Sequence, residues 1–140
     1  MKVVINACYG GFSLSTAAMV RIAEIKGIKL YPEKSKKFSF MNYWLVPPEQ
    51  RPREIETEEW LQMSYEEKRA HNEAVIKVEM DNRNIPRNDP ALIQAVEELG
   101  TKANGDCARL KVVEIPDGID WEIEAYDGLE HVAEKHRSWS

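Results

Sequence analysis

The N-terminal segment MKVVINACYGGFSLS constrains the fold most, because it combines a strand, a glycine turn and a helix start within fifteen residues. The stretch at 2–6 is β-branched and almost uncharged, which is typical of a short buried strand. Ser13 or Ser15 can cap a helix that runs to about Lys26, with Gly27 ending it. A chain with this opening begins with a strand–turn–helix unit.

The centre of the chain gives weaker signals. Apolar and aromatic residues predict strands at 28–31 and 38–46, and a proline-rich link follows at 47–52. Thr57, followed by two glutamates, suits a helix N-terminus, and Ser64 with Glu67 fits a capping box. Alternation of apolar and charged residues then predicts a strand at 75–80.

The last third of the chain has clearer signals for the ends of helices and strands. Asp89-Pro90 predicts a helix start, and Gly100 predicts its end. A β meander is expected after it, with strands at 108–115, 121–126 and 130–134 separated by turns at 116–118 and 127–128. We therefore expect an α+β fold, a small mostly antiparallel sheet packed with two or three helices.

Composition limits the class of protein. The chain has 140 residues, 43% hydrophobic and 31% charged, which predicts a single globular domain over 1–140. A net charge of −5 argues against nucleic acid polymers and anionic membranes as partners, and no segment is apolar enough to cross a membrane. The N-terminal segment lacks the apolar centre of a signal peptide, so a cytoplasmic protein is expected, with Cys8 and Cys107 as reduced core thiols.

Two features near the N-terminus are candidates for ligand binding. Gly10 and Gly11 allow the backbone to approach an anion ahead of a helix N-terminus, although a tight packing turn explains them equally well. Arg21 lies on the same helical stripe as apolar residues, and a buried guanidinium needs a partner. That partner is either a ligand phosphate or subunit contact, or a carboxylate within the fold.

Further candidates lie in the second half of the chain. Arg87 and Asn88 precede a helix N-terminus, where an arginine can grip phosphate and an asparagine can contact a base edge. The simpler alternative is that Asn88 helps cap the helix. Arg109 alternates with Leu110 in a predicted strand, so it is either a solvated side chain or part of a cationic pocket.

Signals for catalysis or metal binding are weak. His71, His131 and His136 lack metal-ligand spacing, so no metal or other cofactor is expected. Cys8, ahead of a helix N-terminus, is a minor candidate for a nucleophile. The carboxylates Glu122 and Glu124 alternate with apolar residues and fit a solvated strand face.

Three segments together resemble a known family. MKVVINACYGGFSLS, RNDPALIQAVEELG and LKVVEIPDGIDWEIEAYDGLEHVAEKHRSW resemble the first described family of bacteriophage Thoeris anti-defence proteins. The resemblance covers about half of the chain and leaves out the region around 31–80. It implies a non-enzymatic sponge that sequesters cyclic ADP-ribose isomers, such as glycocyclic ADP-ribose, made by bacterial TIR proteins in the infected host cell.

The resemblance also implies partners and roles. Family members are oligomers, dimers or hexamers built from dimers, whose nucleotide pocket lies between subunits, and some are thought to hold cyclic dinucleotides or trinucleotides at a separate site. Carried over to this chain, arginines that hold phosphates correspond to Arg21 and Arg109, and the asparagine that holds the base corresponds to Asn88. Tyr9 or Phe12 is the candidate for the aromatic residue that contacts the base.

Two other functions stay open. A small nucleotide-processing enzyme would use Cys8 or a histidine in catalysis. A protein-binding inhibitor would use the central helical region and its Trp60 as an interaction face.

Overall fold

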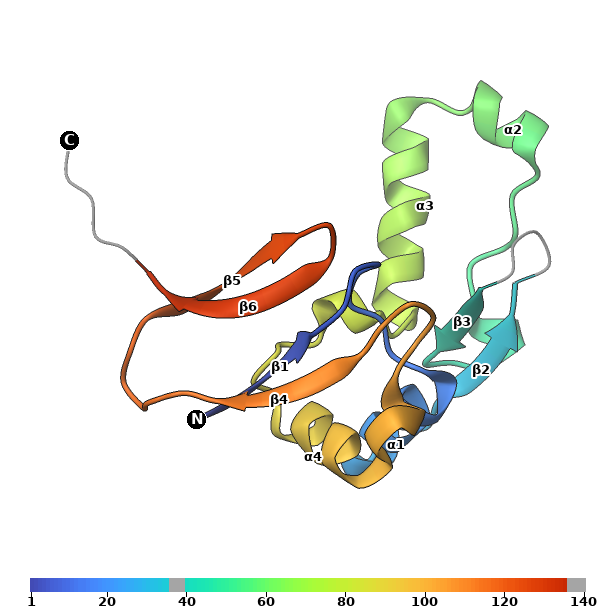
Figure 1. Cartoon of the computed structure of the whole chain (residues 1–140). Coiled ribbons are helices and arrows are strands. Elements are labelled where there is room, and N and C mark those ends of the chain that lie inside the picture. The colour runs from blue at the N-terminus through green and yellow to red at the C-terminus, as the bar shows by residue number, and fades with distance from the viewer. Residues whose placement is uncertain (36–39, 136–140) are drawn as a thin grey trace, which may run out of the picture. The chain divides into compact units, whose positions relative to one another are not determined.

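The computed structural model (Figure 1) describes residues 1–35 and 40–135. In these ranges it has four α-helices and six strands, which pair into three two-stranded antiparallel sheets. The predicted α+β class is confirmed. The residues group into two compact units, one made of Met1–Gly27 and the chain from Asn82 onward, the other of Ile28–Asp81. The expectation of one functional domain stays a prediction.

The first unit contains two antiparallel strand pairs and two α-helices. Its elements are β1 (Lys2–Asn6), α1 (Thr16–Ile25), α4 (Pro90–Leu99), β4 (Leu110–Glu114), β5 (Trp121–Tyr126) and β6 (Leu129–Glu134). The first strand pairs with β4 so that Val4 lies opposite Val112, and β5 pairs with β6. The β5–β6 turn has positive φ at Asp127 and Gly128, as the two-residue hairpin predicted from the sequence requires.

Both helices of this unit begin and end where the sequence predicts. The Ser15 hydroxyl accepts from the Ala18 amide at the start of α1, and Gly27 follows its end with φ +71. The Asp89 carboxylate accepts from the backbone amides of the first turn of α4, and Gly100 closes it. Side-chain caps satisfy amides that have no partner inside the helix, which is why these sequence signals are dependable.

The hydrophobic core lies where α4 packs against α1 and against β1 and β4. Its buried side chains are Val3, Val4, Ile5, Leu14, Ala18, Met19, Ile22, Ala23, Ile85, Ala91, Leu92, Ala95, Val96 and Ala103. All of them belong to the first unit. Both helices of this unit therefore owe their positions to apolar burial.

The second unit consists of one hairpin and two helices. Its elements are β2 (Tyr31–Lys34), β3 (Met41–Trp44), α2 (Thr57–Gln62) and α3 (Tyr65–Val78), with a short 3-10 helix at Pro48–Gln50. The predicted starts at Thr57 and Ser64 are confirmed, since Ser64 caps α3 by accepting from the Glu67 amide. No helix in the described parts of the chain is long and apolar enough to span a membrane.

Several predicted strands differ from the structure. The strand predicted at 75–80 is wrong, because α3 continues to Val78 and only Glu79 forms a β-bridge, with Trp44. The apolar residues of that stretch also fall on one face of a helix, so their alternation with charged residues does not distinguish a strand from a helix. The strand predicted at 28–31 begins only at Tyr31, and the part of the 38–46 strand at 38–39 lies outside the described residues.

The predicted β meander is also incomplete. The 116–118 turn and the β5–β6 hairpin are present, but β4 pairs with the N-terminal strand and β5 pairs with β6 alone. Sequence spacing favours pairing between neighbours, whereas the β1–β4 pairing joins segments far apart in the chain and sets the buried Val3 and Val4 opposite Val113 and Val112.

Candidate functional site

The candidate site is built around Asn6, the last residue of β1, whose side chain is fully buried. Its amide nitrogen donates to the carbonyl oxygens of Cys8 and Gly128, each at 2.7 Å. Its carbonyl oxygen accepts from the backbone amide of Arg109 at 2.9 Å. Buried polar groups are almost always hydrogen-bonded. Asn6 thus joins the CYGGF loop (residues 8–12), the segment before β4 and the tip of the β5–β6 hairpin.

Glycines allow these three segments to approach one another closely. Gly10 and Gly11 have φ values of +118° and +97°, and the Gly10 amide donates to the Asp127 carbonyl at 3.1 Å. A Cβ atom on Gly10 would lie 2.8 Å from the Cβ of Cys107, and one on Gly128 would clash with the backbone of Gly11. The glycine turn therefore packs the fold together, the simpler of the two explanations that the sequence allowed.

Arg87 is a half-buried structural arginine in the same cluster. It forms a bidentate pair with Glu130 of β6, at 2.7 and 2.9 Å, and its guanidinium lies 3.5 Å from the centre of the Phe12 ring. The Glu130 side chain is only 9% exposed, and it also accepts a hydrogen bond from the backbone N–H of Asn6 at 2.8 Å. These contacts bring Arg87, Phe12 and the loop together. They also mean that Arg87 already has a strong anionic partner.

Arg109 and Tyr9 are the exposed members of this cluster. One guanidinium nitrogen of Arg109 donates to the Ala7 carbonyl at 2.7 Å, which holds the side chain against the start of the loop. Within the described ranges no carboxylate pairs with Arg109. Tyr9 is 63% exposed on the same loop. This surface, which we call the loop surface, combines a cation with available donors and a large aromatic side chain.

Arg21 makes its contacts elsewhere. Its guanidinium pairs with Glu98 of α4 at 2.7 Å and with Glu24 at 3.2 Å, so the carboxylate alternative describes it in this chain. The hydrogen bonds that Arg21 donates to Glu98 raise the pKa of Arg21, and together with the one that Gln94 donates they lower the pKa of Glu98 to about 2. The structure does not bring Arg21 to the loop surface through any of these contacts.

Asn88 is exposed, and its amide makes only a long contact of 3.9 Å with the Met1 sulfur. The capping role falls to Asp89, whose carboxylate also pairs with Lys26 at 2.7 Å. Burial acts to raise the pKa of Asp89, but this ion pair and the two capping amides outweigh it and lower the pKa.

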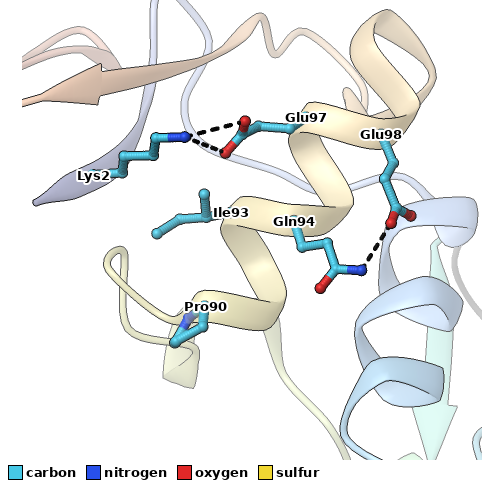
Figure 2. A pocket seen from close by; sticks show the side chains of 6 residues that line it. All are labelled: Lys2, Pro90, Ile93, Gln94, Glu97 and Glu98. Carbon is cyan, nitrogen blue, oxygen red and sulfur yellow. Dashed lines mark hydrogen bonds and ion pairs between the residues drawn. The ribbon is translucent and has the colours of Figure 1, made fainter.

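A shallow groove of about 600 Å³ runs along the outer face of α4 (Figure 2). Ile93 lies at its centre, and Lys2 pairs with Glu97 across one end at 3.1 Å. Its two carboxylates, Glu97 and Glu98, outnumber its single lysine, which disfavours an anionic ligand. None of the residues predicted to bind a ligand lines this groove.

The two thiols are free, and neither is a core residue. Cys8 is half-buried and its thiol donates to the Cys107 carbonyl at 3.0 Å, whereas Cys107 is exposed with φ +61. The expectation of core thiols is therefore wrong, because both lie in the turns that meet at Gly10. In the ranges described, no three histidine, cysteine or acidic residues gather to hold a metal ion, and His136 lies outside those ranges.

Sequence reasoning missed two residues that organise the site. Asn6 carried a usable signal, since a polar residue that ends an apolar strand just before a glycine turn must find hydrogen bonds. Glu130 carried none, because its partners Arg87 and Asn6 lie 43 and 124 residues away. Comparison of the chain with protein-family models, curated proteins and solved structures gives no match.

Proposed function

We propose that this protein binds and sequesters a cyclic ADP-ribose isomer, such as glycocyclic ADP-ribose, and so blocks Thoeris immunity in the cytoplasm of an infected bacterium. The proposal follows from the family resemblance of three segments of the chain. The observation in the structure that supports it best is the loop surface, where Arg109 keeps unused N–H donors and contacts Ala7, two residues before the exposed Tyr9.

Arg109 is the residue proposed to grip a phosphate. A guanidinium presents five N–H donors, and the Ala7 carbonyl uses only one side of the fork. Arg87 and Arg21 each have a carboxylate partner, so a phosphate would have to compete with Glu130 or Glu98. We therefore assign Arg87 to holding Phe12 and the loop in position, and Arg109 to direct contact.

Tyr9 is the aromatic residue proposed to stack on the base. Its side chain is exposed, whereas one face of the Phe12 ring is covered by Arg87. A nucleobase stacked on a tyrosine ring gains binding energy without needing a matched hydrogen-bond pattern. A loop held by Asn6 and by glycine contacts presents this side chain from a fixed backbone, which lowers the entropic cost of binding.

Enclosure of the ligand is proposed to require a second copy of the chain. Tyr9 is largely exposed to solvent in a single copy, which would leave much of a nucleotide bound there exposed as well. Two copies related by a two-fold axis would contribute the same residues from both sides. We propose a homodimer or a larger assembly of dimers as the binding form.

The test separates sequestration from turnover. Purified protein is incubated with a cyclic ADP-ribose isomer, depletion of the free compound is measured, and the compound is released by heating and weighed by mass spectrometry. Intact compound is the expected result. A changed mass would favour an enzyme, with Cys8 as the first residue to replace, and an undiminished free concentration would favour a protein-binding inhibitor.

Variants locate the site. We expect Arg109→Ala to weaken binding at least tenfold, about 1.4 kcal/mol, because it removes a charge-assisted contact to phosphate. Arg69→Ala, which removes an exposed arginine from α3, is the matched control and should leave affinity unchanged. Affinity retained in Arg109→Ala would remove this residue from the site.

A further inference from the structure

The unit Ile28–Asp81 contains a cavity of about 770 Å³, within the usual range for small-molecule sites. Strands β2 and β3, the segment 48–55 and helices α2 and α3 all contribute to its wall. The side chains on which the argument rests are Asn42, Trp44, Arg51, Trp60, His71 and Asn72. None of them belongs to the loop surface.

Trp44 has an unsatisfied polar atom. Its indole Nε1 is buried and has no hydrogen-bond partner in the described parts of the chain. Arg51 lies over the indole ring, 5.0 Å from its centre, and is itself held by the Val46 carbonyl and by Glu33. A buried donor without an acceptor costs about 1–3 kcal/mol. The N–H is closed off from solvent, so a ligand acceptor that reaches it after a small side-chain shift would recover that cost.

Two side-chain amides add further hydrogen-bonding capacity. Asn42 of β3 and Asn72 of α3 line the cavity, and neither amide has a hydrogen bond to a described residue. Each amide offers donors and an acceptor. With the Trp44 indole, the wall presents donors and acceptors together, which matches the edge of a planar heterocycle better than an aliphatic or purely anionic compound.

Another part of the cavity wall is aromatic and apolar. Trp60 and His71 meet edge to face, with their ring centres 6.0 Å apart and an angle of 70° between their planes. Ile55 and Val75 extend the apolar part of the lining. Such a wall favours a ligand with an aromatic face.

The charges of the lining are balanced. Arg51 pairs with Glu33, and Arg53 pairs with Glu59 just outside the cavity. The lining holds two arginines, Arg51 and Arg53, and two glutamates, Glu33 and Glu54. A polyphosphate would meet no net positive field here, so a neutral ligand is favoured.

We propose that the cavity lined by Trp44, Asn42, Asn72 and Trp60 is a binding site for a neutral purine nucleoside, with the base edge at the Trp44 indole and the two amides. This site shares no residue with the loop surface and does not depend on the proposed sequestration of cyclic ADP-ribose isomers.

Adenosine and guanosine are the probes, titrated into the full chain by calorimetry and by ¹H–¹⁵N NMR of the indole N–H groups. We expect saturable binding of at least one nucleoside and a downfield shift of the indole resonance that is missing in Trp44→Phe. Trp44→Phe and Asn72→Ala should each weaken binding about five- to tenfold, as expected for the loss of one hydrogen bond to the ligand. Trp121→Phe, in the other unit, is the control and should bind as the unchanged chain does.

The proposal is overturned if neither nucleoside binds at millimolar concentration, or if Asn72→Ala binds as tightly as the unchanged chain. Asn72 is exposed on α3, so this variant stays informative even if Trp44→Phe fails to fold. Tighter binding of ATP than of adenosine would also overturn it, because the lining would then favour charge. Arg109→Ala should leave nucleoside binding intact, which separates this result from failure at the loop surface.

Discussion

The two units of the molecule are built by different means. Every fully buried residue of the described chain belongs to the first unit, where α4 packs against α1 and β1. The second unit has none, and even the fourteen residues of α3 include no buried side chain. It relies instead on a hairpin, ion pairs and the stacking of Arg51 on Trp44. The Ser64 cap of α3 matches the caps of α1 and α4, although α2 has no side-chain cap, so burial separates the two units more clearly than helix capping does.

The largest contrast is expected from core truncation. Leu92→Ala removes a fully buried side chain of α4 and should lower the free energy of unfolding by about 2–5 kcal/mol. Val75→Ala removes a half-buried side chain of α3 and should cost about 1 kcal/mol or less. Chemical denaturation of the full chain measures both, with the exposed Ile76→Ala as control. Equal losses at Leu92 and Val75 would contradict this difference in packing between the units.

A smaller contrast is expected from the helix caps. Asp89→Ala should lower the free energy of unfolding by about 1 kcal/mol, because α4 loses its N-cap and its start is part of the core. Ser64→Ala should act locally, raising the hydrogen-exchange rates of the first amides of α3 with little change in the global denaturation midpoint. A shift of that midpoint as large as the one from Asp89→Ala would contradict the proposed difference between the units.

The smallest effect is expected from the exposed ion pair of the first unit. Arg21 lowers the pKa of Glu98 from its ordinary value of 4.5 to about 2. A depressed carboxyl pKa stabilises the folded state above the unfolded pKa, and this contribution is lost as the pH falls from about 4.5 towards 2. NMR titration of the Glu98 carboxyl should show its pKa returning towards 4.5 in Arg21→Ala, and a smaller rise in Gln94→Ala. An unchanged titration in Arg21→Ala would exclude this pair as the cause.

Local signals in the sequence predicted the ends of elements well. Ser15, Asp89 and the Asp127-Gly128 turn each act through their own neighbours, so a short window of sequence contains the whole cause. The strand predicted at 75–80 failed for a related reason. Its alternating apolar residues fit a strand and a helix alike, and the hydrogen bonds that extend α3 to Val78 decided between them.

Long-range partners could not be predicted. The sequence predicts that Arg21 needs a partner, but it does not show that Glu98 supplies it, nor that Arg87 pairs with Glu130 and Arg109 with the Ala7 carbonyl. Pairings across 77, 43 and 102 residues depend on how β1, α4 and the β5–β6 hairpin pack. For the same reason the cavity lined by Trp44 could not be predicted, because five separate segments form its wall.

The contact between the tip of the β5–β6 hairpin and the CYGGF loop restricts insertions and deletions in that tip. Glu130 lies two residues beyond Gly128, so its direction depends on the number of residues in the turn. Inserting one residue there would reverse the alternation of β6, turn Glu130 to the opposite face and leave Arg87 without its counter-ion. An insertion or deletion in this tip would therefore have to be matched elsewhere in the hairpin.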